Sequence, residues 1–75
     1  MRKILYMPLL NEGTTVLRPV IATEMGNNVY RIEGTESGLN SEDLDEEWQF
    51  PIGSYVTCIN KQDENNILIA DALLS

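Results

Sequence analysis

Apolar residues along this chain come in short runs that turn-forming residues separate, with no sustained helical period. Such runs, rich in Val, Ile, Thr and aromatic residues, are typical of β-strands. The pattern predicts strands over residues 2–9, 14–24, 29–33, 55–60 and 67–74. Alternation is clearest over 29–33, where Tyr30 and Ile32 share one face. The chain is therefore predicted to be all-β, with one face of its strands buried and the other wet.

Turn-forming residues lie between these runs. Residues 26–28 (Gly-Asn-Asn) predict a tight hairpin, because glycine and asparagine tolerate left-handed backbone. Residues 50–53 predict a type I reversal, with Pro51 at the second place and glycine at the fourth. The polar residues 61–66 predict the loop of a last hairpin. Proline cannot donate to a ladder, so Pro19 either bends its strand or turns its amide side away from the sheet.

Five short strands at close spacing predict a single small five-stranded barrel that covers residues 1–75. Closure of the barrel removes edges that so small a protein could not otherwise protect. A chain of this length holds one domain with a thin core. One parity of the strands supplies that core. The residues predicted to face inward are Val20, Ala22, Tyr30, Ile32, Phe50, Val56 and Cys58.

The terminal run at 67–74 is apolar on both parities, unlike a strand with one wet face. Two arrangements would cover its second face. Either the acidic loop folds over it, or another subunit does so in a weak homodimer. The one charged residue of the run, Asp71, is expected to face outward.

Net charge limits the possible partners. The formal charge is −7, from 12 acidic and 5 basic residues, and the basic residues are scattered along the chain. Phosphate backbones repel such a surface, so no nucleic acid is expected as a partner. No stretch approaches the ~20 apolar residues of a membrane helix. Residues 2–7 resemble the start of a signal peptide, but Pro8 breaks the run and no cleavage site follows, which favours a first strand.

Residue types also limit the chemistry. The chain has no histidine and one cysteine, which excludes an internal disulfide, a Cys/His zinc site and a histidine proton relay. Cys58 shares the inward parity of Val56, so we expect it to be inert packing. There is no phosphate-binding glycine loop and no serine elbow. We therefore expect no enzyme activity and no cofactor, and a lone thiol suits the cytoplasm.

Residues 34–47 are too polar for the core and predict one long acidic loop, with at most a helical turn that Asn40 or Ser41 would cap. Its acids allow three interpretations: a solvated loop, a partner-docking surface, or a metal site. The pattern of an EF-hand is not met. Trp48 and Phe50 would share one strand face, either in the core or as a binding aromatic. The hypothetical partner site comprises Glu42, Asp43, Asp45, Glu46, Glu47 and Trp48.

Two motifs together carry a family resemblance. The R-P-V-x-A pattern at residues 18–22, followed by W-x-F-x-x-G-x-x-V-x-C at 48–58, resembles small bacterial proteins of unknown function. The order of strands, hairpins and loop is similar to that of SH3-like barrels. The resemblance covers about residues 15–72, judged by strand spacing. It implies an architecture and no chemistry.

Two functions from different classes remain open. The first is a non-enzymatic protein-interaction module, inhibitor-like or immunity-like, that docks a partner of basic charge on the acidic loop. The alternative is a structural unit that forms a homodimer through its terminal strands. A nucleic-acid-binding barrel is a distant third because of the charge.

Overall fold

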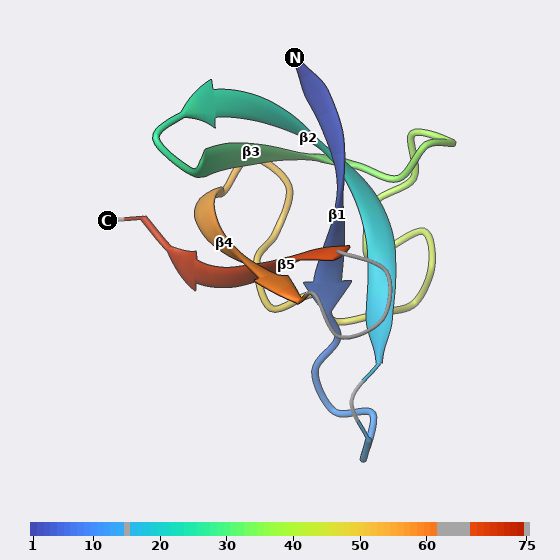
Figure 1. Ribbon diagram of the computed structural model, residues 1–75. Helices are drawn as coiled ribbons and strands as arrows, with labels where there is room; N and C mark the ends of the chain where they lie inside the picture. Colours follow the sequence, from blue (N-terminus) through green and yellow to red (C-terminus); the bar gives the residue numbers. More distant parts are fainter. Residues whose placement is uncertain (15, 62–66, 75) are drawn as a thin grey trace.

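Five β-strands follow one another along the chain and close into a small barrel, as Figure 1 shows. The computed structural model describes residues 1–14, 16–61 and 67–74. The strands are β1 (Arg2–Pro8), β2 (Leu17–Gly26), β3 (Val29–Gly34), β4 (Tyr55–Lys61) and β5 (Ile67–Leu73). No described residue belongs to a helix. The predicted all-β class and five-stranded barrel are confirmed, and the topology is consistent with an SH3-like barrel.

The strand count decides how the barrel closes. Each strand pairs antiparallel with the next, so the first and the fifth run in the same direction. The closing pair is therefore parallel, and it joins Tyr6 to Ile69. β5 crosses β1 near its own start and then runs beside β4 towards the C terminus (Figure 1). The β1–β5 seam is consequently short, whereas β1 pairs with β2 along its whole length.

The predicted strand bounds needed their largest correction in β2, and the other four strands each differ from the prediction by one residue at one end. β1 ends at Pro8, and Leu9 forms an isolated bridge to Trp48 instead. β2 begins at Leu17 rather than at residue 14 and continues to Gly26. Its pairing with β3 is irregular at two places, with an extra residue in β3 at Glu33 and an extra residue in β2 at Met25. The loop predicted at 61–66 lies outside the described residues, apart from its first position.

Pro19 lies inside β2 without costing a ladder hydrogen bond. The amide of Glu24 donates to the carbonyl of Met1 over 2.7 Å, so even-numbered residues of β2 direct their amides to β1. The ring nitrogen of Pro19 therefore faces the opposite edge. The β3 ladder at that edge begins at Ile21, which pairs with Gly34. Of the two arrangements that the sequence allowed, the structure has the one in which the nitrogen faces away from the paired strand.

Both tight turns depend on positive φ angles. Asn27 and Asn28 have φ of 54° and 62°, as a type I′ hairpin requires, and this turn was predicted. The turn before β4 was predicted one residue too early. The amide of Ser54 donates to the carbonyl of Pro51 over 3.1 Å, which places Gly53 (φ 88°) third in the turn. A positive φ at the third place is a property of type II turns, so the type I prediction was wrong.

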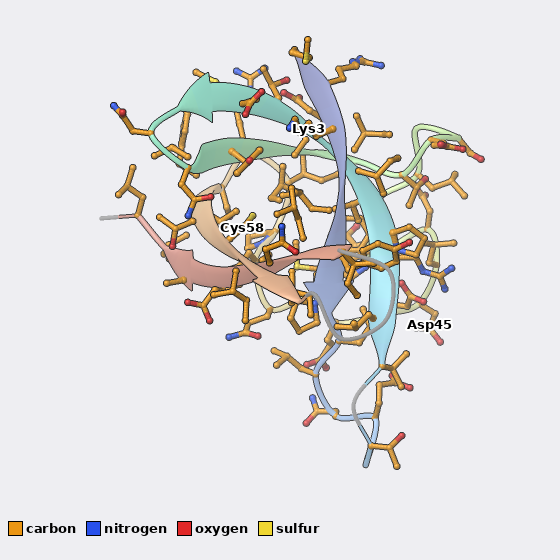
Figure 2. All side chains as sticks on the ribbon, in the orientation of Figure 1. Lys3, Asp45 and Cys58 are labelled. Carbon is orange, nitrogen blue, oxygen red and sulfur yellow. The ribbon has the colours of Figure 1, made fainter. Side chains whose placement is uncertain are left out.

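The seven residues predicted to form the core are all buried. Strand β1 adds Leu5 and Met7, which are fully buried, and β5 adds Ala70. Trp48 is only 6% exposed and belongs to the same cluster. Figure 2 shows how these side chains fill the space between the strands, and Cys58 is labelled among them. Asp71 on β5 is exposed, as expected.

Candidate functional site

Residues 35–54 connect β3 to β4 through successive turns, and we call residues 35–47 the acidic segment. The segment starts with a tight departure from β3. Gly34 has a φ of 126°, and a Cβ atom there would lie 3.1 Å from the carbonyl oxygen of Leu39. The side chain and carbonyl of Thr35 then accept the amides of Leu39 and Gly38, at 3.0 and 2.9 Å. Glycine at position 34 thus lets the first turn pack directly against the barrel.

The second turn is hydrogen-bonded at both ends. The side chain of Asn40 accepts the amide of Asp43 over 2.9 Å, and the carboxylate of Asp43 accepts the amide of Asn40 over 3.1 Å. This reciprocal pair is the arrangement of a capping box. At the other end, the amide of Glu46 donates to the carbonyl of Ser41 over 2.9 Å, and Asp45 has a φ of 53°. These bonds satisfy backbone groups as a Schellman motif does, so the turn has a defined shape.

A charged anchor attaches this turn to the barrel. The guanidinium of Arg18 on β2 donates to both carboxylate oxygens of Glu46, and the two form an ion pair. The indole nitrogen of Trp48 donates to the same carboxylate over 3.0 Å. The Glu46 side chain is 11% exposed, whereas that of Arg18 is 40% exposed. A partly buried carboxylate with three charge-assisted donors is a strong local contact.

The same contacts set the protonation state of Glu46. Hydrogen bonding from Arg18 is the largest influence and lowers the pKa of Glu46, while burial acts in the opposite direction. The Trp48 indole lowers it further. Hydrogen bonding to Glu46 raises the pKa of Arg18 in turn. Glu46 is therefore ionised at neutral pH and committed to Arg18.

The six residues of the predicted partner site separate into three groups. Trp48 is core, which decides the alternative that the sequence left open, so its ring offers no contact area to a partner. Glu46 is committed to the anchor. Four acids are exposed at the surface: Glu42, Asp43, Asp45 and Glu47. Within the described chain, Asp43 bonds to Asn40, and Glu47 accepts a hydrogen bond from the side chain of Asn11 over 2.6 Å. Glu42 and Asp45 make neither hydrogen bonds nor ion pairs through their side chains with described residues.

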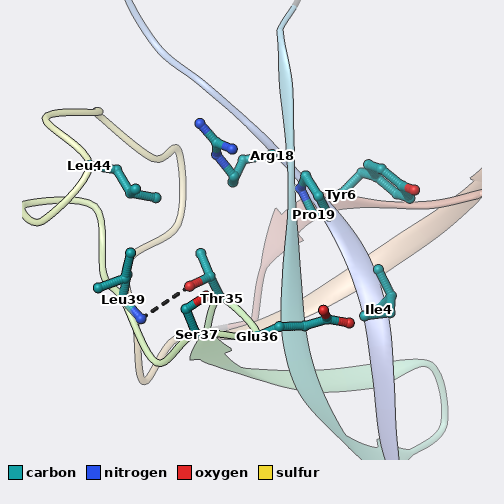
Figure 3. A pocket seen from close by; sticks show the side chains of 9 residues that line it. All are labelled: Ile4, Tyr6, Arg18, Pro19, Thr35, Glu36, Ser37, Leu39 and Leu44. Atoms are coloured by element: carbon teal, nitrogen blue, oxygen red, sulfur yellow. Dashed lines mark hydrogen bonds between the residues drawn. The ribbon is translucent and has the colours of Figure 1, made fainter.

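A groove of about 460 Å³ lies between the acidic segment and the barrel. Figure 3 shows its two walls, with Leu39 and Leu44 on one side of β2 and Ile4 and Tyr6 on the other. The floor is the outer face of β2, where Pro19 is exposed because it has the opposite parity to the buried Val20 and Ala22. The remaining lining residues are Arg18, Thr35, Glu36 and Ser37. The groove therefore combines apolar walls with a carboxylate and a guanidinium.

Sequence reasoning missed this groove and the role of Arg18. The groove joins residues from β1, β2 and the acidic segment, which no local pattern places together. Arg18 did leave a signal, because it shares the parity of the buried residues Val20 and Ala22. A cation at an inward-facing parity needs an anion beside it, and the structure supplies Glu46.

Other kinds of site receive no support from the described residues. No three of their acidic and cysteine side chains are placed to hold a metal ion. The described residues form no helix, and thus none that could cross a membrane. Burial is the main cause that raises the pKa of the Cys58 thiol to about 11, with a smaller influence from Asp71. Few thiolate ions form near neutral pH at such a value, which suits a packing role.

Comparison with family models, curated proteins and solved structures gave no match to this chain. The resemblance based on residues 18–22 and 48–58 therefore stays a prediction.

Proposed function

We propose that the chain is a non-enzymatic cytoplasmic protein-interaction module that docks a basic partner, as an inhibitor or immunity protein would. The observation that supports this most is the array of exposed carboxylates along the acidic segment, which also forms one wall of a half-apolar groove. The array consists of Glu36, Glu42, Asp43, Asp45 and Glu47. Function often concentrates on such connections when a rigid scaffold holds them.

The charges of the described chain favour a cationic partner. Residues 35–54 hold six of the twelve acids and no lysine or arginine. Three of the cations elsewhere are already paired: Lys3 with Glu24, Arg18 with Glu46, and Arg31 with Glu33. The carboxylates of the acidic segment, apart from Glu46, are thus left without a cation from the described residues. A basic surface would be steered towards them and would compensate their charge.

The groove supplies the apolar contact that charged side chains alone do not provide. Exposed ion pairs contribute little affinity, and buried apolar contact at the centre of an interface usually contributes more. Trp48 cannot make that contact because it is core. That contact can come from apolar side chains of the groove, which also holds the carboxylate of Glu36: Ile4, Tyr6, Leu39 and Leu44. The proposed site is therefore the groove together with the exposed carboxylates of the acidic segment.

The test uses two peptides, a ten-residue Lys–Leu alternating peptide and an all-lysine peptide of equal length. We expect the alternating peptide to bind more tightly at matched salt, because its leucines can enter the groove. The double variant Glu42→Gln/Asp45→Asn should weaken this binding about three- to tenfold and reduce its dependence on salt. Binding is measured by fluorescence anisotropy.

A second double variant, Glu12→Gln/Asp71→Asn, serves as the matched control. It removes the same charge from exposed positions outside the acidic segment. It should bind the alternating peptide within about twofold of the wild type, because only long-range attraction changes. Equal weakening by the two double variants would show that net charge alone acts, and the proposed site would be abandoned.

A further inference from the structure

The acidic segment faces β1 and β2 and not the terminal apolar run. It forms its groove with residues of β1 and β2, and Leu73 of β5 is left 60% exposed. Of the two ways to cover the run at 67–74, folding of the acidic loop over it is therefore not the one that the described chain adopts. The binding surface that the acidic segment forms lies beside β1 and β2.

Of the described charged residues, only Arg18 and Glu36 line the groove, and they lie at different places in it. Figure 3 shows the guanidinium of Arg18 on the side of β2 where Leu44 lies, and the carboxylate of Glu36 on the side where Ile4 lies. Arg18 is already paired with Glu46. The carboxylate of Glu36 makes no hydrogen bond or ion pair with a described residue. The groove therefore presents the charge of one carboxylate.

A second hollow continues beyond Glu36. It shares Glu36 with the groove, and its other charged residues are Arg2 and Glu33. Glu33 is ion-paired with Arg31. Arg2 forms no ion pair with a described residue, so Glu36 has no paired cation among the described residues on this side either. The carboxylate of Glu36 is therefore open to a cation that enters the groove.

The walls of the groove suit the stem of a long cationic side chain. Ile4 is 40% exposed and Leu39 is 37% exposed, so both present apolar surface in the groove that holds Glu36. Arginine and lysine lay their methylene stems along such surface while the charged end contacts an anion. A guanidinium is more weakly hydrated than an ammonium, and it binds a carboxylate through two parallel hydrogen bonds. A half-apolar groove with one open carboxylate therefore favours arginine over lysine.

We propose that the groove takes an arginine side chain of the basic partner, with the guanidinium on Glu36 and the stem between the apolar walls. This inference rests on the proposed function, and it names the partner residue that the site recognises. Glu36 then determines specificity inside the groove. The other exposed carboxylates of the acidic segment contribute mainly long-range attraction.

The test uses a ten-residue peptide of glycine and serine with Leu-Arg-Leu at its centre. In two matched peptides, lysine or citrulline replaces the arginine, and citrulline is an uncharged analogue of similar shape. Dissociation constants are measured by NMR titration, which also reports whether the amide signals of the groove residues shift. We expect the arginine peptide to bind about three- to fivefold more tightly than the citrulline peptide. It should bind about two- to threefold more tightly than the lysine peptide.

The variant Glu36→Gln tests the proposed contact directly. It should weaken binding of the arginine peptide about three- to fivefold, and leave binding of the citrulline peptide within about twofold, because only the guanidinium loses its partner. The matched control Glu12→Gln removes the same charge at an exposed position outside the groove. It should bind both peptides within about twofold of the wild type.

Three results overturn the arginine assignment while the proposed function stands. The first is equal weakening of the arginine and citrulline peptides by Glu36→Gln, and the second is an equal effect of the two variants on the arginine peptide. The third is a lysine peptide that binds as tightly as the arginine peptide. If the arginine peptide does not bind although the Lys–Leu alternating peptide does, this inference alone is refuted. If neither peptide binds the wild type, the proposed function is refuted with it.

Discussion

Individual side chains of similar type have different tasks in this barrel. Glu46 and Asp45 are neighbours in the sequence, yet one is held by Arg18 and Trp48 while the other is exposed. Trp48 and Cys58, the residues that invite a functional interpretation, are both buried in the core. Their chemistry is correspondingly limited to packing and, for Trp48, one hydrogen bond.

Ile32 is the position where the thin core can be tested most directly. It is fully buried in β3, so Ile32→Ala should lower the free energy of unfolding by about 2–5 kcal/mol. That is a large part of what a domain of this size possesses. Urea denaturation gives the value. The control Ile59→Ala, at an exposed position and measured at low concentration, should cost less than about 1 kcal/mol. Equal costs would show that the face of β3 is misassigned.

At the scale of elements, the acidic segment depends on its attachment to β2. The turn at 40–46 closes its own backbone bonds, but Arg18 and Trp48 determine where that turn lies on the barrel. The position of the exposed carboxylates relative to the groove is thus set by the ion pair of Glu46 with Arg18 and its hydrogen bond with Trp48.

Arg18→Met should lower the free energy of unfolding by about 1 kcal/mol at neutral pH, allowing for the exposure of the guanidinium. The pKa of Glu46 is lowered in the folded state, so the contribution of the pair is present above the ordinary value of 4.5. It is lost as pH falls through the lowered pKa. The difference between wild type and variant, from urea titrations at several pH values, should therefore shrink below about pH 4.5.

Lys3→Met is the comparison for this prediction. Its ion pair with Glu24 is longer, at 3.8 Å, and exposed, so its effect should stay within a few tenths of a kcal/mol. A constant difference between wild type and Arg18→Met across the acid range would contradict the role assigned to Glu46.

At the scale of the whole molecule, the distribution of charge separates the possible partners. The net charge is −7, and three of the described cations are engaged in ion pairs. We expect no binding to a short fluorescent DNA duplex or RNA strand at low salt, because the described residues leave no cluster of unpaired cations to replace counterions. Fluorescence anisotropy is the measurement, with a lysine-rich peptide as the positive control. Sequence-independent binding at micromolar concentration would refute this prediction and revive the nucleic-acid interpretation.

The strands, the closed barrel and the inward parity followed from the sequence alone. These features depend on residues that are close together in the sequence. The alternation of Tyr30 and Ile32 places both on one face of a strand, and the adjacent Asn27 and Asn28 form a tight turn. Errors at the sequence level were also local. The turn before β4 lies one residue later than predicted, because Gly53, with its positive φ, occupies the third place of the turn.

Tertiary structure decided the site. The anchor joins Arg18 to Glu46 across 28 positions, and the groove joins three separate segments. The sequence also left open whether Trp48 is in the core or at the surface, and a bridge to Leu9, which is distant in the sequence, places it. Sequence patterns report which face of a strand is apolar, because neighbours along the chain alternate sides. They do not report which faces of distant segments meet, because those contacts depend on how the strands curve and close. In this protein such contacts decide which acidic side chains stay at the surface.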